Sequence, residues 1–221
     1  MDEKKVCFVV CVNDRQRYEE CLLYLQHLVL PLGIEAEVVP VCGAVSMASG
    51  YNAAMRQSQA KYKVYLHQDV YITQKDLLQC AIEIFANNDK IGMIGLTGCT
   101  KLPGSAIWWD TLGEKYGVIA QGITPEHIEL SNHDDMIEDY HEVEAIDGLF
   151  MMTQYDILWR EDIFAGWHFY DISQCMEFQR QGYKIVVPQQ EEPWCIHDCG
   201  RQILGADYEY WRNRFLQVYR V

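Results

Sequence analysis

Three polar residues follow an apolar stretch in the segment KYKVYLHQDVYI, which covers residues 61–72. Tyr62 to Leu66 has the composition of a buried strand, and His67, Gln68 and Asp69 come directly after it. A buried carboxylate without a partner costs on the order of several kcal/mol, so something must compensate Asp69. Carboxylate oxygens are ligands that Mg²⁺ and Mn²⁺ prefer, and both ions bridge to phosphate oxygens. The segment therefore predicts a divalent cation at Asp69; a turn in which Asp69 only caps the following residues is the alternative.

The preceding and following segments alternate between strand and helix patterns. Val6 to Val12 is a continuous apolar run, typical of a strand buried on both faces of a parallel sheet. Asn13 and Asp14 then offer a helix cap. Similar patterns predict further strands at 38–41, 62–66 and 91–96 and helices at 18–28, 46–60 and 77–85. This alternation predicts an α/β sheet, whose ligands bind beyond the carboxyl ends of the strands, where His67 to Asp69 lie.

Beyond Gly98 the alternation stops. Glycines and tryptophans indicate a loop-rich insert, and we expect the acidic stretch 126–144 to be an exposed loop or a short helix. A helix over 172–181 ends at Gly182, and a strand follows at 183–188. A terminal amphipathic helix at 205–221 is expected to pack on the core.

The composition restricts the partners. A chain of 221 residues with 49% hydrophobic and 23% charged residues suits one globular domain. A net charge of -14 argues against nucleic acid, and an anionic ligand would need a metal ion or a helix amino terminus. No apolar run is long enough for a transmembrane segment, and nine cysteines without paired spacing favour reduced thiols, so we expect a cytoplasmic protein. Homo-oligomerisation stays open.

Several motifs are absent from the sequence. It contains no P-loop, GxGxxG, GxSxG, HExxH or CxxC pattern. P-loop nucleotide hydrolysis, dinucleotide redox chemistry, serine hydrolysis and zincin proteolysis therefore lack their usual signals.

The segment SGYNAAMRQSQAKYKVYLHQDV resembles the nucleotide-binding half of family 2 glycosyltransferases of the GT-A fold. In that family a helix rich in Asn, Gly and Ala leads into a strand that ends in a D-x-D motif. The resemblance places His67 at the first D and Asp69, as a metal ligand, at the last. The opening VVCVND is similar to the family's first strand. The donor-binding residues that the resemblance implies are Asn13, Ser49, Asn52, His67 and Gln68.

Two later segments extend the resemblance. IFAGWHFYDISQCMEFQRQGYKIVVP is similar to the family's E-D-x-D-L stretch with its following helix, and it places Asp171 on the second residue of the E-D pair. Tyr170 replaces the Glu, which removes a contact to the acceptor. In PWCIHD, His197 matches the histidine that completes the metal site. His67 at the first D leaves one carboxylate there instead of two, which affects donor preference.

The resemblance implies a three-layer α/β/α, Rossmann-like fold around a central, mostly parallel mixed sheet. The activity that it implies is hexosyltransferase-type: a sugar moves from a nucleotide-diphosphate donor to the hydroxyl of a carbohydrate or other acceptor, with inversion and with Mn²⁺ or Mg²⁺. About 1–98 would bind the donor, and about 99–200 the acceptor. The alternatives are a non-catalytic sugar-nucleotide or carbohydrate-binding module and a metal-dependent nucleotidyltransferase.

Asp171 would act as the general base on the acceptor hydroxyl. The structural alternative is a capping box of Asp171 with Gln174, in which the helix dipole lowers the pKa of Asp171. His197 lies between Cys195 and Cys199, so a zinc site or a buried structural histidine are its alternatives.

Aromatic side chains could stack on an acceptor sugar, although core packing explains each tryptophan as well. The candidates for acceptor binding are Trp108, Trp109, Trp167 and His168, with Asp147 as a further acidic residue.

Overall fold

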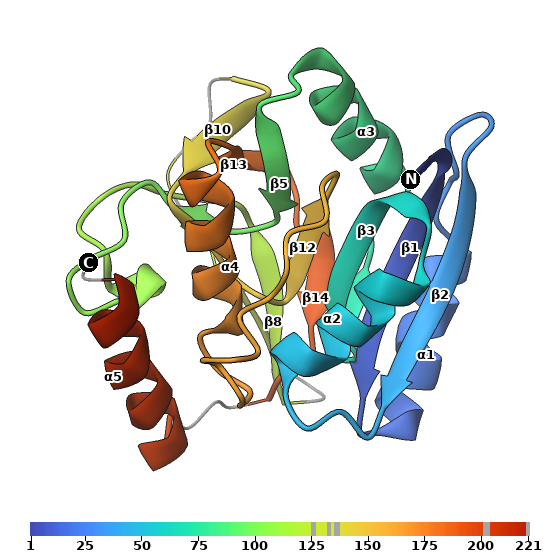
Figure 1. Cartoon of the computed structure of the whole chain (residues 1–221). Coiled ribbons are helices and arrows are strands. Elements are labelled where there is room, and N and C mark those ends of the chain that lie inside the picture. Colours follow the sequence, from blue (N-terminus) through green and yellow to red (C-terminus); the bar gives the residue numbers. More distant parts are fainter. Residues whose placement is uncertain (125–126, 132–133, 135–137, 201–203, 220–221) are drawn as a thin grey trace.

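A seven-stranded sheet forms the middle layer of the protein (Figure 1). The structure, a computed structural model, describes residues 1–124, 127–131, 134, 138–200 and 204–219. The strand order is β10-β13-β5-β12-β3-β1-β2; β10 and β12 run antiparallel to their neighbours, and the others are parallel to one another. These strands are β1 (Asp2–Val12), β2 (Glu35–Cys42), β3 (Ala60–His67), β5 (Ile91–Gly95), β10 (Tyr140–Val143), β12 (Phe150–Thr153) and β13 (Lys184–Pro188).

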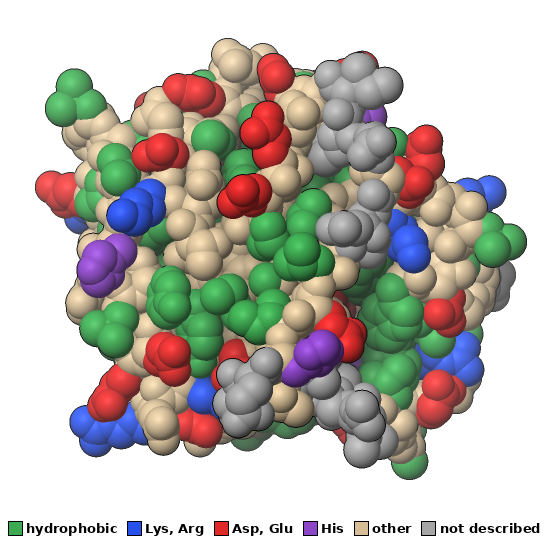
Figure 2. Space-filling view, turned by 180° about the vertical axis from the view of Figure 1, so that it is seen from behind, with side chains coloured by type: hydrophobic (Ala, Val, Ile, Leu, Met, Phe, Trp, Pro, Cys, Tyr) green, Lys and Arg blue, Asp and Glu red, His purple; other side chains and the backbone are tan. Residues whose placement is uncertain are grey.

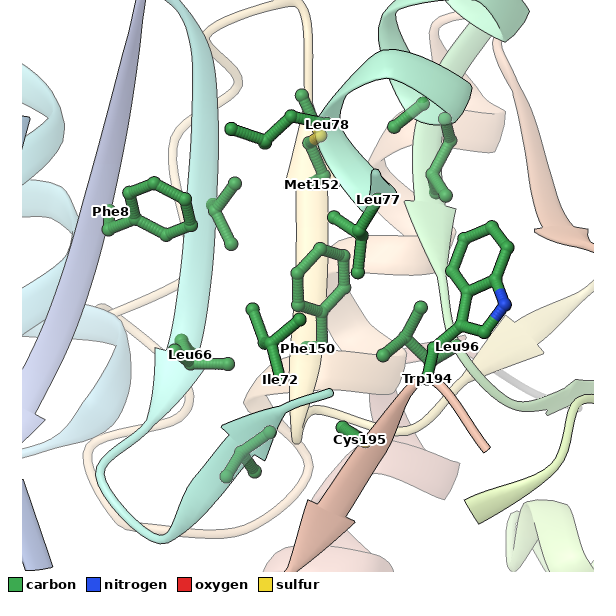
Figure 3. Packing of buried hydrophobic residues seen from close by; sticks show 14 of the residues in the cluster. Phe8, Leu66, Ile72, Leu77, Leu78, Leu96, Phe150, Met152, Trp194 and Cys195 are labelled. Carbon is green, nitrogen blue, oxygen red and sulfur yellow. The ribbon is translucent and has the colours of Figure 1, made fainter. Parts of the chain in front are cut away.

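Helices cover both faces of this sheet. Alternate residues of β1 supply the two faces: Phe8 packs with α1 (Arg15–Gln26) and α3 (Leu77–Asn87), and Val9 packs with α2 (Met47–Gln57) and α4 (Tyr170–Arg180). Figure 3 shows the first of these layers, in which Leu77 lies close to Phe150 and belongs to the same cluster as Phe8 and Leu66. The predicted α/β/α architecture with a mostly parallel mixed sheet is confirmed.

A second sheet lies beside the first and has the order β4-β14-β8-β9. Its strands are β4 (Val70–Ile72), β14 (Cys195–His197), β8 (Ile119–Thr124) and β9 (His127–Ser131). Because β4 follows β3 after a two-residue turn, the second sheet begins directly after the segment His67 to Asp69. A third sheet, ordered β11-β6-β7, is made of β6 (Gly98–Cys99), β7 (Lys115–Tyr116) and β11 (Ala145–Ile146).

The terminal helix α5 (Ala206–Tyr219) packs on a separate aromatic cluster. Tyr208 and Phe215 are buried there against Phe164 and Phe169, close to the short 3₁₀ helix η1 (Trp108–Asp110). The expected packing of this helix on the core is confirmed. In the described part of the chain, no helix has the length and apolar composition needed to cross a bilayer.

The acidic stretch 126–144 differs from the expected loop or short helix. Its described residues include β9 and β10, and none of them is helical. β10 pairs with β13 at the edge of the large sheet, where Val143 faces the core and Glu142 contacts Lys184 at 2.7 Å. Pairing of β10 with β13 and of β9 with β8 therefore gives the described residues of this segment a strand structure, despite its charge.

Candidate functional site

Asp69 and the two histidines His67 and His197 lie together at the carboxyl end of β3. β14 pairs antiparallel with β4, which sets His197 opposite Val70, and the Asp198 N–H donates to the Asp69 carbonyl at 2.8 Å. His197 Nε2 is 3.7 Å from Asp69 Oδ1. One ligand atom from each of His67, Asp69 and His197 lies within 4.8 Å of the others. This donor set fits a divalent metal ion.

The surroundings of the two histidines shift their pKa values in opposite directions. Burial lowers the pKa of His67, against the attraction of Asp69. Burial also acts to lower the pKa of His197, but a hydrogen bond with Cys199 and the charge of Asp69 outweigh it, so the net shift is upward. A lowered pKa favours the neutral imidazole of His67 near pH 7.

Arg17 also contacts Asp69. Its Nη1 lies 3.2 Å from Asp69 Oδ2, and the Asp69 side chain retains only 18% of its exposure. Asp69 is thus compensated within the chain by Arg17 and His197. The sequence analysis missed Arg17; the signal was a cation three residues after the helix cap Asp14, at the carboxyl end of the first strand.

A cavity of about 420 Å³ opens beside this cluster, at the carboxyl ends of β1, β2 and β3. Gln68 connects the strand ends, because its Oε1 accepts hydrogen bonds from the N–H groups of Asn13 and Asp14, both at 2.9 Å. The predicted residues that line the cavity are Asn13, His67, Gln68, Asp69 and Trp167. Five residues that were predicted from three separate parts of the chain therefore meet here.

Ser49 and Asn52 do not line this cavity. Ser49 forms a capping box with Ser46 at the start of α2. Asn52 is 1% exposed, and its amide exchanges two hydrogen bonds of 2.9 Å with the backbone of Trp159. Asn52 faces the core side of α2, and its contact with a donor stays a prediction.

Asp171 lies in the first turn of α4, and the proposed capping box with Gln174 is wrong. The helix cap is Phe169, with φ 62°, and the amide of Gln174 donates instead to the Ile157 carbonyl at 2.7 Å. Asp171 Oδ2 accepts a hydrogen bond from the Gly148 N–H at 3.1 Å.

The expected lowering of the Asp171 pKa is also wrong. Burial, followed by repulsion from Asp147, raises the pKa of Asp171 from 3.8 to about 7, although backbone N–H groups of Ile172 and Gly148 act against the shift. Desolvation and a neighbouring carboxylate therefore outweigh the amino-terminal dipole of α4.

Tyr170 is buried and its hydroxyl forms a hydrogen bond with His67 Nε2. Gly148 makes room for this contact, since a Cβ there would collide with the Tyr170 hydroxyl. The residue that was expected only to remove an acceptor contact is therefore joined to the end of β3.

The remaining predicted residues are more dispersed. Trp108 is buried in the α5 cluster, and Trp109 is 39% exposed beside it. Trp167 is 45% exposed. His168 Nε2 lies 3.9 Å from Asp207, and Asp147 accepts a hydrogen bond from the Leu149 N–H at 2.9 Å.

The zinc alternative for His197 gains no support. Cys195 is fully buried on β14, and among the described residues the metal-binding group contains no cysteine.

A second cavity, of about 360 Å³, lies between α1 and the segment after β4. It is mainly apolar and is lined by Leu23, Tyr24, Leu28 and Ile72. Figure 2 shows the back of the molecule, where apolar side chains form a patch among acidic and other polar groups. This cavity lacks the cluster of ligating groups found at Asp69.

Comparison with known proteins gives a consistent result. A model described as a glycosyltransferase-like family matches residues 7–219. A comparison with curated protein sequences found no match.

Three solved structures are similar in fold. A mannosyltransferase from Pyrobaculum calidifontis, in complex with GDP-Man and Mn²⁺, has a TM-score of 0.56 at 14% identity, over 97% of this chain and 61% of that chain. S. aureus TarS in complex with UDP-GlcNAc has a TM-score of 0.55 at 11% identity, over 91% of this chain and 60% of that chain. A mutant Drosophila β1,4-galactosyltransferase 7 with manganese, UDP-Gal and xylobiose has a TM-score of 0.55 at 11% identity, over 94% of this chain and 79% of that chain.

The chain thus spans about three fifths of the first two of these proteins. The similarity confirms the GT-A-like fold.

Proposed function

The chain belongs to the glycosyltransferase-like family, and from this premise we propose that it transfers a sugar from a nucleotide-diphosphate donor to an acceptor hydroxyl, with inversion. The observation that carries the proposal is the arrangement of residues at the carboxyl ends of the parallel strands. A metal-binding group, a cavity of about 420 Å³ and a carboxyl group with a pKa of about 7 lie on neighbouring elements there.

The donor occupies the cavity at the ends of β1, β2 and β3, where Asn13 and Gln68 present polar groups. Asp69 and His197 would hold Mn²⁺ or Mg²⁺ at this site. When bound, the ion neutralises the charge that develops on the diphosphate leaving group. Two of the similar structures carry manganese with a nucleotide sugar, which supports this assignment. In a chain of net charge -14, a bound cation is also the simplest means of attracting an anionic donor.

Asp171 removes the proton from the acceptor hydroxyl as the oxygen attacks the anomeric carbon. A base works best when its pKa is near the working pH, and the pKa of Asp171, at about 7, meets that condition. Asp147, which raises that pKa, lies in the turn between β11 and β12. A positioned base of this kind contributes about 10²–10⁴-fold to the rate.

The two halves of the chain bind different substrates. Residues 1–98 supply the lining of the donor cavity except for Trp167, and 99–200 supply Asp147, Asp171 and His197 together with the acceptor surface. Trp167 and His168 precede α4, and Trp167 lines the cavity. These two residues contact the acceptor, and Trp109, packed against the buried Trp108, extends that surface. The helix at 205–221 supports this side of the molecule through its described residues 206–219.

The test uses a panel of nucleotide sugars with Mn²⁺. Calorimetry identifies the donor that binds, and release of nucleoside diphosphate is then measured with water or added saccharides as acceptor. We expect metal-dependent binding and release of diphosphate, with an inverted anomer in the NMR spectrum of the product. A donor that binds but stays intact under all conditions would show a binding module, and the absence of any bound nucleotide sugar would refute the proposal.

A further inference from the structure

The two positions at which this chain departs from the glycosyltransferase motifs contact each other. His67 stands where the D-x-D motif has its first carboxylate, and Tyr170 stands where the E-D pair has its Glu. In the structure, the Tyr170 hydroxyl forms a hydrogen bond with His67 Nε2. The two substituted residues, His67 and Tyr170, are therefore joined, and Tyr170 affects which ligand His67 can bind.

The hydrogen bond at Nε2 affects the other ring nitrogen. When Nε2 carries the proton and donates it to the Tyr170 oxygen, Nδ1 keeps its lone pair. Histidine ligands of metals usually donate their other N–H to a fixed acceptor, which sets the tautomer and the ring orientation. Tyr170 can act as that acceptor because it is buried in the first turn of α4, and Gly148 leaves space for its hydroxyl.

The position of His67 favours a metal ligand over a donor contact. His67 shares the 4.8 Å group with Asp69 and His197, and its ring centroid lies 5.7 Å from that of His197. These residues are positioned by β3 and by the β4–β14 pairing, so the backbone fixes all three. A contact of His67 with the ribose or base of the donor is the competing assignment, since His67 also lines the cavity.

We propose that His67 is the third protein ligand of the metal, held by Tyr170, and that the resulting site with two histidines and one carboxylate selects Mn²⁺ and similar transition-metal ions over Mg²⁺. This inference rests on the metal dependence in the proposed function. Imidazole suits transition-metal ions, whereas Mg²⁺ prefers oxygen ligands and keeps several waters. Replacing a carboxylate by an imidazole at this position thus weakens the binding of Mg²⁺ more than the binding of Mn²⁺.

The experiment counts the ligating nitrogens directly. The full chain is loaded with Mn²⁺ and inorganic pyrophosphate, which supplies a diphosphate without a base or sugar, and pulsed electron paramagnetic resonance detects ¹⁴N coupled to Mn²⁺. Protein labelled with ¹⁵N only in histidine assigns the signals to imidazole. Calorimetry with Mn²⁺ and with Mg²⁺ gives the ratio of the two affinities.

Three variants accompany the wild type. His67→Asp returns a carboxylate to the position, Tyr170→Phe removes the hydroxyl that holds the ring, and His127→Asp makes the same exchange at an exposed histidine outside the site. We expect two histidine nitrogens on Mn²⁺ in the wild type and one in His67→Asp, whose preference for Mn²⁺ falls about tenfold or more. Tyr170→Phe should keep both nitrogens but bind Mn²⁺ about tenfold more weakly. His127→Asp should match the wild type.

A single coordinated histidine nitrogen in the wild type would overturn the inference, and that measurement does not depend on any variant. An unchanged spectrum and affinity ratio in His67→Asp would overturn it too, and would assign His67 to the donor. Either result leaves the proposed transferase intact. If the wild type binds no metal, the metal dependence of the proposed function fails together with the inference.

Discussion

Asp69 and Asp171 are two carboxylates of the same candidate site, but the charges around them are opposite. Asp69 lies between two basic side chains, with Arg17 at 3.2 Å and His197 at 3.7 Å. Asp171 is half-buried near a second carboxylate, Asp147, and accepts a hydrogen bond from the backbone of Gly148. A carboxylate between Arg17 and His197 can exchange its contact with Arg17 for a metal ion that His197 also binds. A carboxyl group beside another carboxylate is suited to hold a proton near neutral pH.

The difference comes from the elements that hold each residue. Asp69 lies in the turn between β3 and β4, which is within reach of α1 and its Arg17. Asp171 lies under the turn between β11 and β12, where Gly148 permits close packing. The neighbours thus favour two different proposed roles for the same residue type, and four substitutions test this comparison.

The largest effect is expected for Asp171→Asn. The amide cannot accept the proton of the acceptor, so kcat should fall by about 10²-fold or more, and donor affinity should not change, because Asp69 and His197 are intact. Asp89→Asn is the control. Asp89 is exposed just before β5, at the amino ends of the parallel strands and therefore at the opposite end from the site. Near-normal turnover in a folded Asp171→Asn protein would move the role of base to Asp147.

Stability provides a second measurement on the same variant. The folded-state pKa of Asp171 is raised from 3.8 to about 7, so the folded protein holds an extra proton between these values. This contribution to stability is present at low pH and is lost as the pH rises through about 7. Asn avoids the loss, and we expect the melting temperature of Asp171→Asn at pH 8 to be no lower than that of the wild type.

Asp69→Asn should show the opposite pattern. It removes the charge of the proposed metal ligand, so the affinity for a nucleoside diphosphate with Mn²⁺ should fall by about 10–100-fold, to the value measured with EDTA. Calorimetry with and without EDTA, with Asp89→Asn as control, checks this. If binding is independent of metal and unaffected by the substitution, Asp69 is only a turn residue that pairs with Arg17.

Asp147→Asn should move the pH dependence. Because Asp171 must be ionised to accept a proton, kcat should rise with pH through about 7 in the wild type. Removing the charge of Asp147 lowers the pKa of Asp171, so the rise should shift to lower pH by about one unit. The profile of kcat against pH measures the shift, and an unchanged midpoint would mean that another group controls the rise.

The sequence predicted the elements of this site better than their electrostatics. Apolar runs and capping residues located β1, β3 and α1, and glycine marked the end of α4. The proximity of His197 to Asp69 came only from the family resemblance, because it depends on the pairing of β4 with β14. The pKa of Asp171 could not be predicted, since it depends on burial and on Asp147, which lies on another element.

The directions of the side chains on the helices could not be predicted from the sequence either. Asn52 and Arg17 are both polar residues of helices that follow strands, but Asn52 faces the core and binds the Trp159 backbone, and Arg17 faces Asp69. A shift of one residue in the phase of either helix would exchange a packing role for a site role. Pattern analysis does not fix helix phase to that accuracy.

The smallest effect is expected for Arg17→Gln, and it tests whether Arg17 and the metal compete for Asp69. The Arg17 side chain is 39% exposed, so solvent screens its ion pair, which is worth about 0.2–1 kcal/mol. Removing the guanidinium should therefore tighten binding of Mn²⁺ alone by only about two- to fivefold. Arg15→Gln is a matched control, because Arg15 lies on the same helix, pairs with Glu19 at 2.8 Å and changes the net charge equally. Calorimetry with Mn²⁺ at two salt concentrations separates the local effect from the general one. Weaker Mn²⁺ binding in Arg17→Gln than in Arg15→Gln would show that Arg17 orients Asp69 for the metal, and the two carboxylates would then differ less than their surroundings indicate.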